Sequence, residues 1–331
     1  MKTALCDRLG IEVPIVQAAM GGASCPALAA AVSNAGGLGM LALSWSDEDD
    51  IRRQIGETRA LTRRPFGINL VLNRSQDERL AVCLDERVPV VSLFWGDPAA
   101  LVDRAHGAGA KVLHTVSCAR QARAAAAAGI DAIVAQGWEA GGHVAGQVAT
   151  LPLVRAVVEA AGGTPVIAAG GIADGRGLAA ALALGAAGAW IGTRFLASEE
   201  AAIHPRYRER LLAASEADTV HCGLFDIGWP NAPHRVLRNA TVDEWEAAGR
   251  PSAGARPGEG ESVAWTAAGA PIARYTSATP RAGDSGDIDA LSLWAGQSVG
   301  MVKAVAPAGD IVREIATEAW AVLRALGREC Q

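Results

Sequence analysis

The chain has 331 residues, half of them hydrophobic and 20% of them charged, and it contains 38 glycines. This composition is typical of a globular protein with a large buried core. The formal net charge of −5 gives no electrostatic reason to expect nucleic acid or a membrane surface as a partner. The six cysteines are scattered without a CxxC pair, which indicates reduced thiols. Because the first residues also lack a signal-peptide pattern, we expect a cytoplasmic protein.

Short apolar segments alternate with alanine- and leucine-rich amphipathic segments along the first two-thirds of the chain. The apolar segments are continuously hydrophobic, as buried parallel strands are. Strands are expected at residues 14–18, 39–43, 66–71, 89–93, 111–115, 131–136, 165–169 and 188–192. Helices are expected at residues 24–35, 47–61, 97–108, 118–128, 151–161 and 174–184. Eight such units predict an α/β fold, a (β/α)8 TIM barrel, with a doubly wound open sheet as the alternative.

The alternation stops after the eighth unit, which predicts three regions. Residues 1–217 are expected to form the barrel. Residues 218–287, rich in Pro, Gly, Trp and charge, form an insert. This insert could be a lid, an oligomer contact, or a surface excursion with its own apolar cluster. Residues 288–331 are expected to add two helices, at 288–305 and 310–326, that pack on the barrel as a C-terminal extension.

Glycine-rich loops follow the last two predicted strands. Gly170 and Gly171 come after the seventh strand, and Gly192 and Thr193 come after the eighth. In TIM barrels these two loops commonly hold a phosphate through backbone N–H groups. The simpler interpretation of Gly-Gly as a tight turn stays open, but the pairing of two such loops favours a phosphate site.

One histidine and one glutamate lie among glycines in the stretch QGWEAGGHVAG, residues 136–146. Either the stretch is a flexible surface loop, or its glycines allow a ligand to approach the backbone and the imidazole. His143 is then a candidate for proton abstraction near neutral pH, because imidazole is best matched to that task. Glu139 could orient it or pair with an arginine outside the site. No histidines have metal-ligand spacing, so we predict no metal.

Several motifs together resemble the nitronate monooxygenase family, formerly called 2-nitropropane dioxygenases. They include PIVQAAMGGAS, AAAVSNAGGLGML, RPFGINLVL, AQGWEAGGHVAG, PVIAAGGIADGRG, GTRFLASEE and AGQSVGMV, which follow in family order over nearly the whole chain. The resemblance implies an FMN-bearing barrel that oxidises alkyl nitronates with O2 to a carbonyl compound and nitrite. A nitronate or nitroalkane and O2 are therefore the expected partners, and a homo-oligomer is compatible with the sequence.

The resemblance also assigns roles to individual residues. His143 corresponds to the catalytic histidine, which takes the α-proton of a nitroalkane or positions a nitronate beside the flavin. The remaining positions imply flavin contacts: Met20 and Asn69 at the ring or ribityl chain, Gln136 and Gly141 along the isoalloxazine, and Gly170, Gly171, Gly192 and Thr193 at the phosphate. Gln297 and Ser298 match a family stretch without an assigned role.

Three positions depart from the family pattern. Ala19 stands where proline is frequent, and Val144 stands where an arginine often follows the histidine. Thr115 stands where some related quinone reductases carry lysine, which argues against that branch. These changes leave the substrate open, because pocket side chains set specificity. The alternatives are an NAD(P)H-dependent flavin reductase acting on a quinone or, like enoyl-ACP reductase II, on an enoyl thioester, and a flavin-binding barrel without catalysis.

Overall fold

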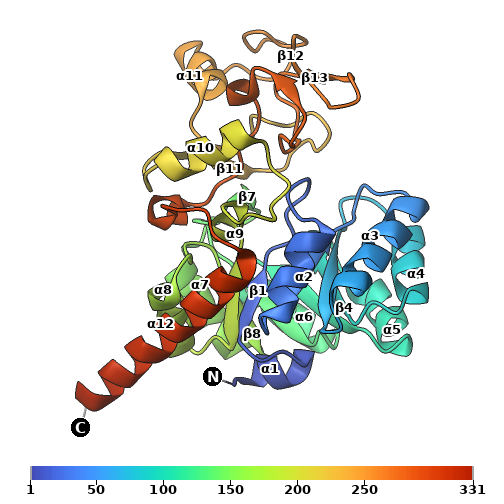
Figure 1. The fold of residues 1–331 in the computed structure, drawn as a ribbon, viewed down its shortest axis with the longest axis vertical. Helices are drawn as coiled ribbons and strands as arrows, with labels where there is room; N and C mark the ends of the chain where they lie inside the picture. Colours follow the sequence, from blue (N-terminus) through green and yellow to red (C-terminus); the bar gives the residue numbers. More distant parts are fainter. Residues whose placement is uncertain (1, 330–331) are drawn as a thin grey trace.

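The computed structural model describes residues 2–329 and is built around one eight-stranded parallel sheet (Figure 1). Its strand order is β1-β9-β8-β6-β5-β4-β3-β2. A parallel bridge between Val16 and Leu38 joins β1 to the start of β2, so the sheet closes into a barrel. The strands are β1 Ile15–Gln17, β2 Gly39–Ala42, β3 Phe66–Val71, β4 Val90–Phe94, β5 Lys111–Val116, β6 Ala132–Gln136, β8 Val166–Ala169 and β9 Gly188–Ile191. The predicted TIM barrel is confirmed, and the open-sheet alternative is wrong.

Helices follow the strands and surround the barrel (Figure 1). Their bounds are α2 Pro26–Asn34, α3 Glu48–Leu61, α4 Asp77–Asp85, α5 Ala99–Gly107, α6 Ala119–Ala127, α7 Thr150–Ala160, α8 Gly175–Ala183 and α9 Thr193–Leu196. Helix α10, Pro205–Ala213, lies above the barrel and contacts η1 (Ile288–Ala290) and η2 (Gln297–Met301) of the later chain (Figure 1). Helix α4 was not predicted. The short helix α1, Ala4–Leu9, closes the bottom of the barrel with Leu5 and Leu9, which pack against the interior residues of the strands.

The hydrophobic core has two layers because successive strand residues point to opposite faces. Val90 belongs to the barrel interior, with Met40 and Leu113. Its neighbour Val91 belongs to the layer between the strands and the helices. Both layers are fully covered, which explains why the strands are continuously apolar.

The insert forms a separate layer over the carboxyl ends of the strands (Figure 1). It holds α11 Ala240–Ala247, and β10 Thr219–Cys222 pairs with β11 His234–Leu237, which pairs in turn with β7 Gly142–His143. A second small sheet consists of β12 Ser262–Trp265, β13 Pro271–Ala273 and β14 Ser285–Gly286. The insert has its own cluster of buried residues: Leu224, Phe225, Val236, Val242 and Tyr275. Through β7, the loop that carries His143 is part of the insert's sheet.

The predicted helix over 288–305 is wrong. The region instead contains two short 3-10 helices, η1 Ile288–Ala290 and η2 Gln297–Met301. The segment that joins them, residues 291–297 with the first residue of η2 included, is called the strap below. Backbone donors of the strap bond to the barrel: Gly296 N–H to Thr193 Oγ1, and Gln297 N–H to the Glu139 carbonyl, both at 3.0 Å. These tertiary bonds replace the helical ones. The last predicted helix is present as α12, Ala308–Glu329, which packs on α8 and α2. Among the described residues, no helix is long and apolar enough to cross a membrane.

Candidate active site

A cavity of about 900 Å³ lies between the carboxyl ends of the strands and the insert. The structure brings every residue of the predicted site to its wall: Met20, Asn69, Gln136, Gly141, His143, Gly170, Gly171, Gly192 and Thr193. Strand ends supply most of them, and the insert and the strap supply the opposite wall. The cavity therefore sits where ligands bind in TIM barrels.

The loops after β8 and β9 expose their backbone to this cavity. Gly170 has φ 104° and Gly171 has φ 72°, in the left-handed region that favours glycine. A Cβ on Gly170 would lie 3.0 Å from Thr150 Oγ1, so a larger residue is also excluded by space. Thr193 Oγ1 accepts the Gly296 N–H and keeps its own proton free to donate. This arrangement has the form of a phosphate cradle.

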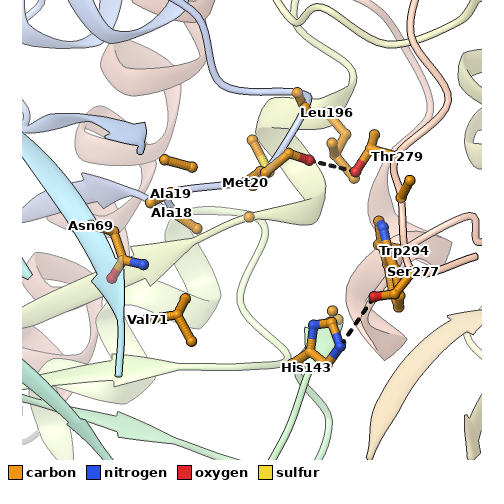
Figure 2. Close-up of a pocket in the computed structure, with 18 of the residues that line it drawn as sticks. Ala18, Ala19, Met20, Asn69, Val71, His143, Leu196, Ser277, Thr279 and Trp294 are labelled. Atoms are coloured by element: carbon orange, nitrogen blue, oxygen red, sulfur yellow. Dashed lines mark hydrogen bonds between the residues drawn. The ribbon is translucent and has the colours of Figure 1, made fainter. Parts of the chain in front are cut away.

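Asn69 supplies the clearest sign of a missing ligand. Its side chain is 7% exposed and points into the cavity (Figure 2), yet it forms no hydrogen bond with any described residue. Its amide is therefore free to form hydrogen bonds with a molecule that occupies the cavity. Gln136 is partly satisfied, because its Nε2 donates to the His143 carbonyl at 3.0 Å.

His143 lies on the cavity wall between aromatic rings. Its imidazole stacks on Trp229, with 3.9 Å between ring centroids, and Nε2 lies 3.5 Å from Ser277 Oγ (Figure 2). Burial lowers the pKa of His143 to about 3, and the neighbouring His234 adds to the shift. At neutral pH the ring is therefore uncharged, with one N–H donor and one acceptor nitrogen.

Glu139 has a structural role. Its carboxylate accepts the Thr150 backbone N–H at 2.8 Å and the Thr150 hydroxyl at 2.9 Å. It therefore satisfies the first turn of α7, which no N-cap side chain does. Among the described residues Glu139 neither contacts the His143 ring nor forms an ion pair with an arginine, so neither role expected for it is seen.

The glycines of the His143 loop are explained mainly by packing between chain segments. A Cβ on Gly141 would lie 2.4 Å from Gly296 N, and one on Gly137 would lie 2.0 Å from Thr150 Oγ1. Gly142 meets no atom but has φ 72°. The loop is thus neither a flexible excursion nor only room for a ligand, because the strap lies directly against it.

The insert also lines the cavity, and none of its lining residues belongs to a recognisable motif. They include Trp229, Ser277 and Arg281. Trp229 is 6% exposed and its ring is surrounded by those of Trp45, Phe94 and Trp95, with centroids 5.3 to 6.3 Å away. In the sequence, only the tryptophan content of the insert indicates that it could contribute to a site. It was ambiguous, because Trp265 is 43% exposed and lies outside the cavity.

Comparison with known proteins places the chain among flavoenzymes. A family model described as nitronate monooxygenase matches residues 2–78 and 73–318. The nitronate monooxygenase of Paraburkholderia phytofirmans is 34% identical, covering 96% of this chain and 95% of that protein. The (3aS,4S,5R,7aS)-5-hydroxy-7a-methyl-1-oxo-octahydro-1H-indene-4-carboxyl-CoA dehydrogenase of Mycobacterium tuberculosis is 40% identical, covering 76% of this chain and 70% of that protein.

Solved structures agree with the family model. FabK from Thermotoga maritima superposes with a TM-score of 0.84 at 37% identity and covers 99% of both chains. Nitroalkane oxidase from Streptomyces ansochromogenes has a TM-score of 0.78 at 31% identity and covers 98% of this chain and 100% of that one. The chain therefore belongs to the nitronate monooxygenase family of flavin-dependent oxidoreductases.

Proposed function

We propose that the protein is an FMN-dependent reductase that uses NAD(P)H to saturate the double bond of an α,β-unsaturated acyl thioester. The observation that carries this proposal is the volume of the cavity. At about 900 Å³ it is near the upper end of the range for small-molecule sites, about 300 to 1,000 Å³. It therefore has room for a flavin and for a substrate of some length.

The residues present fit FMN. The unpartnered Asn69 amide faces the space expected for the flavin ring system, while Gly170, Gly171, Gly192 and Thr193 offer donors to its phosphate. Met20 and Gln136 line the wall between these two ends. When bound, FMN would supply hydride transfer, taking two electrons from NAD(P)H and passing them to the β-carbon of the substrate.

The insert supplies both apolar and charged residues to the cavity wall, and the charged ones are Arg281 and Asp284. The insert contributes Ala267, Ala268 and Ile272, which suit an acyl chain. Arg281 lines the same cavity, and its guanidinium forms no ion pair within residues 2–329. The apolar residues suit the acyl chain, and a guanidinium without an ion pair can bind an anionic group of the acyl carrier. The 40%-identical relative is named for a CoA thioester, which supports this substrate class.

His143 is assigned to hydrogen bonding in this reaction. A histidine with a pKa of about 3 is a weak base at neutral pH, but its N–H can still donate. Placed against the thioester carbonyl oxygen, a neutral imidazole polarises the substrate and stabilises the negative charge that develops there. Ser277 and the Trp229 ring hold the imidazole in place. The α-carbon takes its proton from solvent at the cavity mouth, which balances the reaction.

The test separates the two half-reactions. FMN-loaded protein is mixed with NADH or NADPH without oxygen, and the flavin absorbance is followed. We expect one of the nucleotides to bleach the flavin and trans-2-octenoyl-CoA to restore the absorbance, with the saturated thioester as product. Absence of bleaching by both nucleotides would overturn the proposal.

Nitronate oxidation is the second candidate, favoured by the family model and by the nitronate monooxygenases that match over most of the chain. In that reaction His143 would donate to a nitronate oxygen beside the flavin. A small nitronate would leave the insert end of the cavity unfilled, which is why this activity ranks second. Nitrite release from propyl-2-nitronate under air measures it directly.

A further inference from the structure

A second cavity, of about 750 Å³, lies beside the first, next to the ends of β4 and β5 and the start of α6. Phe94, Thr115 and Gln136 line both cavities. A long ligand with one end at the flavin could therefore place its other end here. The cavity has polar groups that neither the fold nor the predicted chemistry uses.

His114 is the first of these groups. It is 6% exposed and lines the second cavity, and its Nδ1 lies 3.0 Å from the Leu93 carbonyl oxygen. Since a carbonyl only accepts, Nδ1 carries the proton and Nε2 is an acceptor. Nε2 has no hydrogen-bond partner among residues 2–329. Nε2 is therefore free to accept from an N–H or O–H group of a ligand in the cavity.

Two charged residues, Arg120 and Asp97, line the same cavity. Arg120 is in the first turn of α6, which has no side-chain cap and no acidic residue, and its guanidinium forms no ion pair among the described residues. A cation at an uncapped helix N-terminus favours a phosphate. Asp97 uses one carboxylate oxygen to accept the Ala99 N–H at 3.0 Å. Its other oxygen can accept from a sugar hydroxyl.

We propose that the second cavity binds the adenosine phosphate end of a long substrate or co-substrate. The phosphate lies at Arg120 and the start of α6, the ribose hydroxyls donate to Asp97, and the adenine amino group donates to His114 Nε2. Phe94 offers an aromatic face to the base. Both NAD(P)H and a CoA thioester carry this chemistry, and the choice between them rests on the proposed reductase function.

Direct binding tests the site without reference to turnover. Three mimics are titrated separately into the FMN-loaded protein, and binding is measured by calorimetry. Adenosine 2′,5′-bisphosphate mimics NADPH, 5′-ADP mimics NADH, and adenosine 3′,5′-bisphosphate mimics CoA. We expect at least one to bind, and Arg120→Ala to weaken it about five- to tenfold. Arg123→Ala is the matched control, because Arg123 is exposed on the same helix, forms no ion pair in the described chain and lies outside the cavity.

The outcomes separate the site from the reaction. Weaker binding in Arg120→Ala alone supports the site, and the mimic that binds identifies the source of the adenosine phosphate. No binding of any mimic, or equal weakening in both arginine variants, overturns the site. If a mimic binds normally while NADH and NADPH both fail to bleach the flavin, the site stands and the reductase function fails. In an active reductase, Arg120→Ala should raise the KM of the corresponding compound with little change in kcat.

Discussion

The contact between the His143 loop and the strap predicts that a substitution at Gly141 lowers the stability of the protein. A Cβ there would lie 2.4 Å from Gly296 N and 2.5 Å from the Ala295 carbonyl carbon, so Gly141→Ala must displace the strap backbone. Overpacking of this kind costs about 1 to 3 kcal/mol. Displacement also breaks the strap's bonds to Thr193 and Glu139, each worth about 1 kcal/mol. We expect the free energy of unfolding to fall by about 3 to 5 kcal/mol, measured by urea denaturation.

Gly21→Ala provides the control for this experiment. Gly21 lines the same cavity, but a Cβ at this position meets no atom within 4 Å and its φ is not positive. The substitution should therefore change stability by less than about 1 kcal/mol. The reasoning fails if Gly141→Ala unfolds at the same urea concentration as Gly21→Ala. It would also fail if Gly141→Ala kept full stability and lost only FMN, since the glycine would then serve the ligand alone.

Three further substitutions test other parts of the structure. His143→Ala should lower the kcat of thioester reduction about 100-fold at unchanged flavin content, and unaltered turnover would remove His143 from the reaction. Trp229→Ala should admit water to the imidazole and raise the pKa of His143 from about 3 towards the usual 6.5, measured by NMR titration; an unchanged pKa would mean that Trp229 does not desolvate the ring. Asp131 is 5% exposed, and the Val112 N–H and His106 lower its carboxyl pKa although burial opposes them. Its contribution to stability is therefore present above the unfolded pKa of about 3.9 and lost as pH falls through the folded value. Asp131→Asn should cost about 1.5 to 3 kcal/mol at pH 7 and reduce this acid dependence, and equal stability curves would contradict it.

The barrel could be predicted from the sequence because its strands are buried on both faces. Continuous apolar runs mark such strands, and each predicted strand overlaps an observed one. Helix α4 is not among the predicted helices, although with nine residues it is as long as α5 and α6, which are. The helix at 288–305 was wrongly predicted because its backbone partners lie on Thr193 and Glu139, far away in the chain.

The site could be predicted in part for the same reason. Parallel strands bring their carboxyl ends to one edge of the barrel, so Asn69, His143 and Gly170 had to lie near one another once the barrel was inferred. Trp229 and Ser277 reach His143 only through the fold of the insert, which no periodicity or motif indicates. The glycines at 137 and 141 were attributed to the ligand, whereas their neighbours are Thr150 and the strap.

The most direct test of the proposed chemistry compares two substrates on one preparation of the FMN-loaded protein. The kcat/KM for trans-2-octenoyl-CoA at saturating NADH or NADPH is measured without oxygen, and that for propyl-2-nitronate is measured under air. We predict that the thioester is preferred, because the acyl chain can contact the apolar wall at Ile272. Rapid nitrite release with no reduction of the thioester would contradict the proposal and identify nitronate oxidation as the activity.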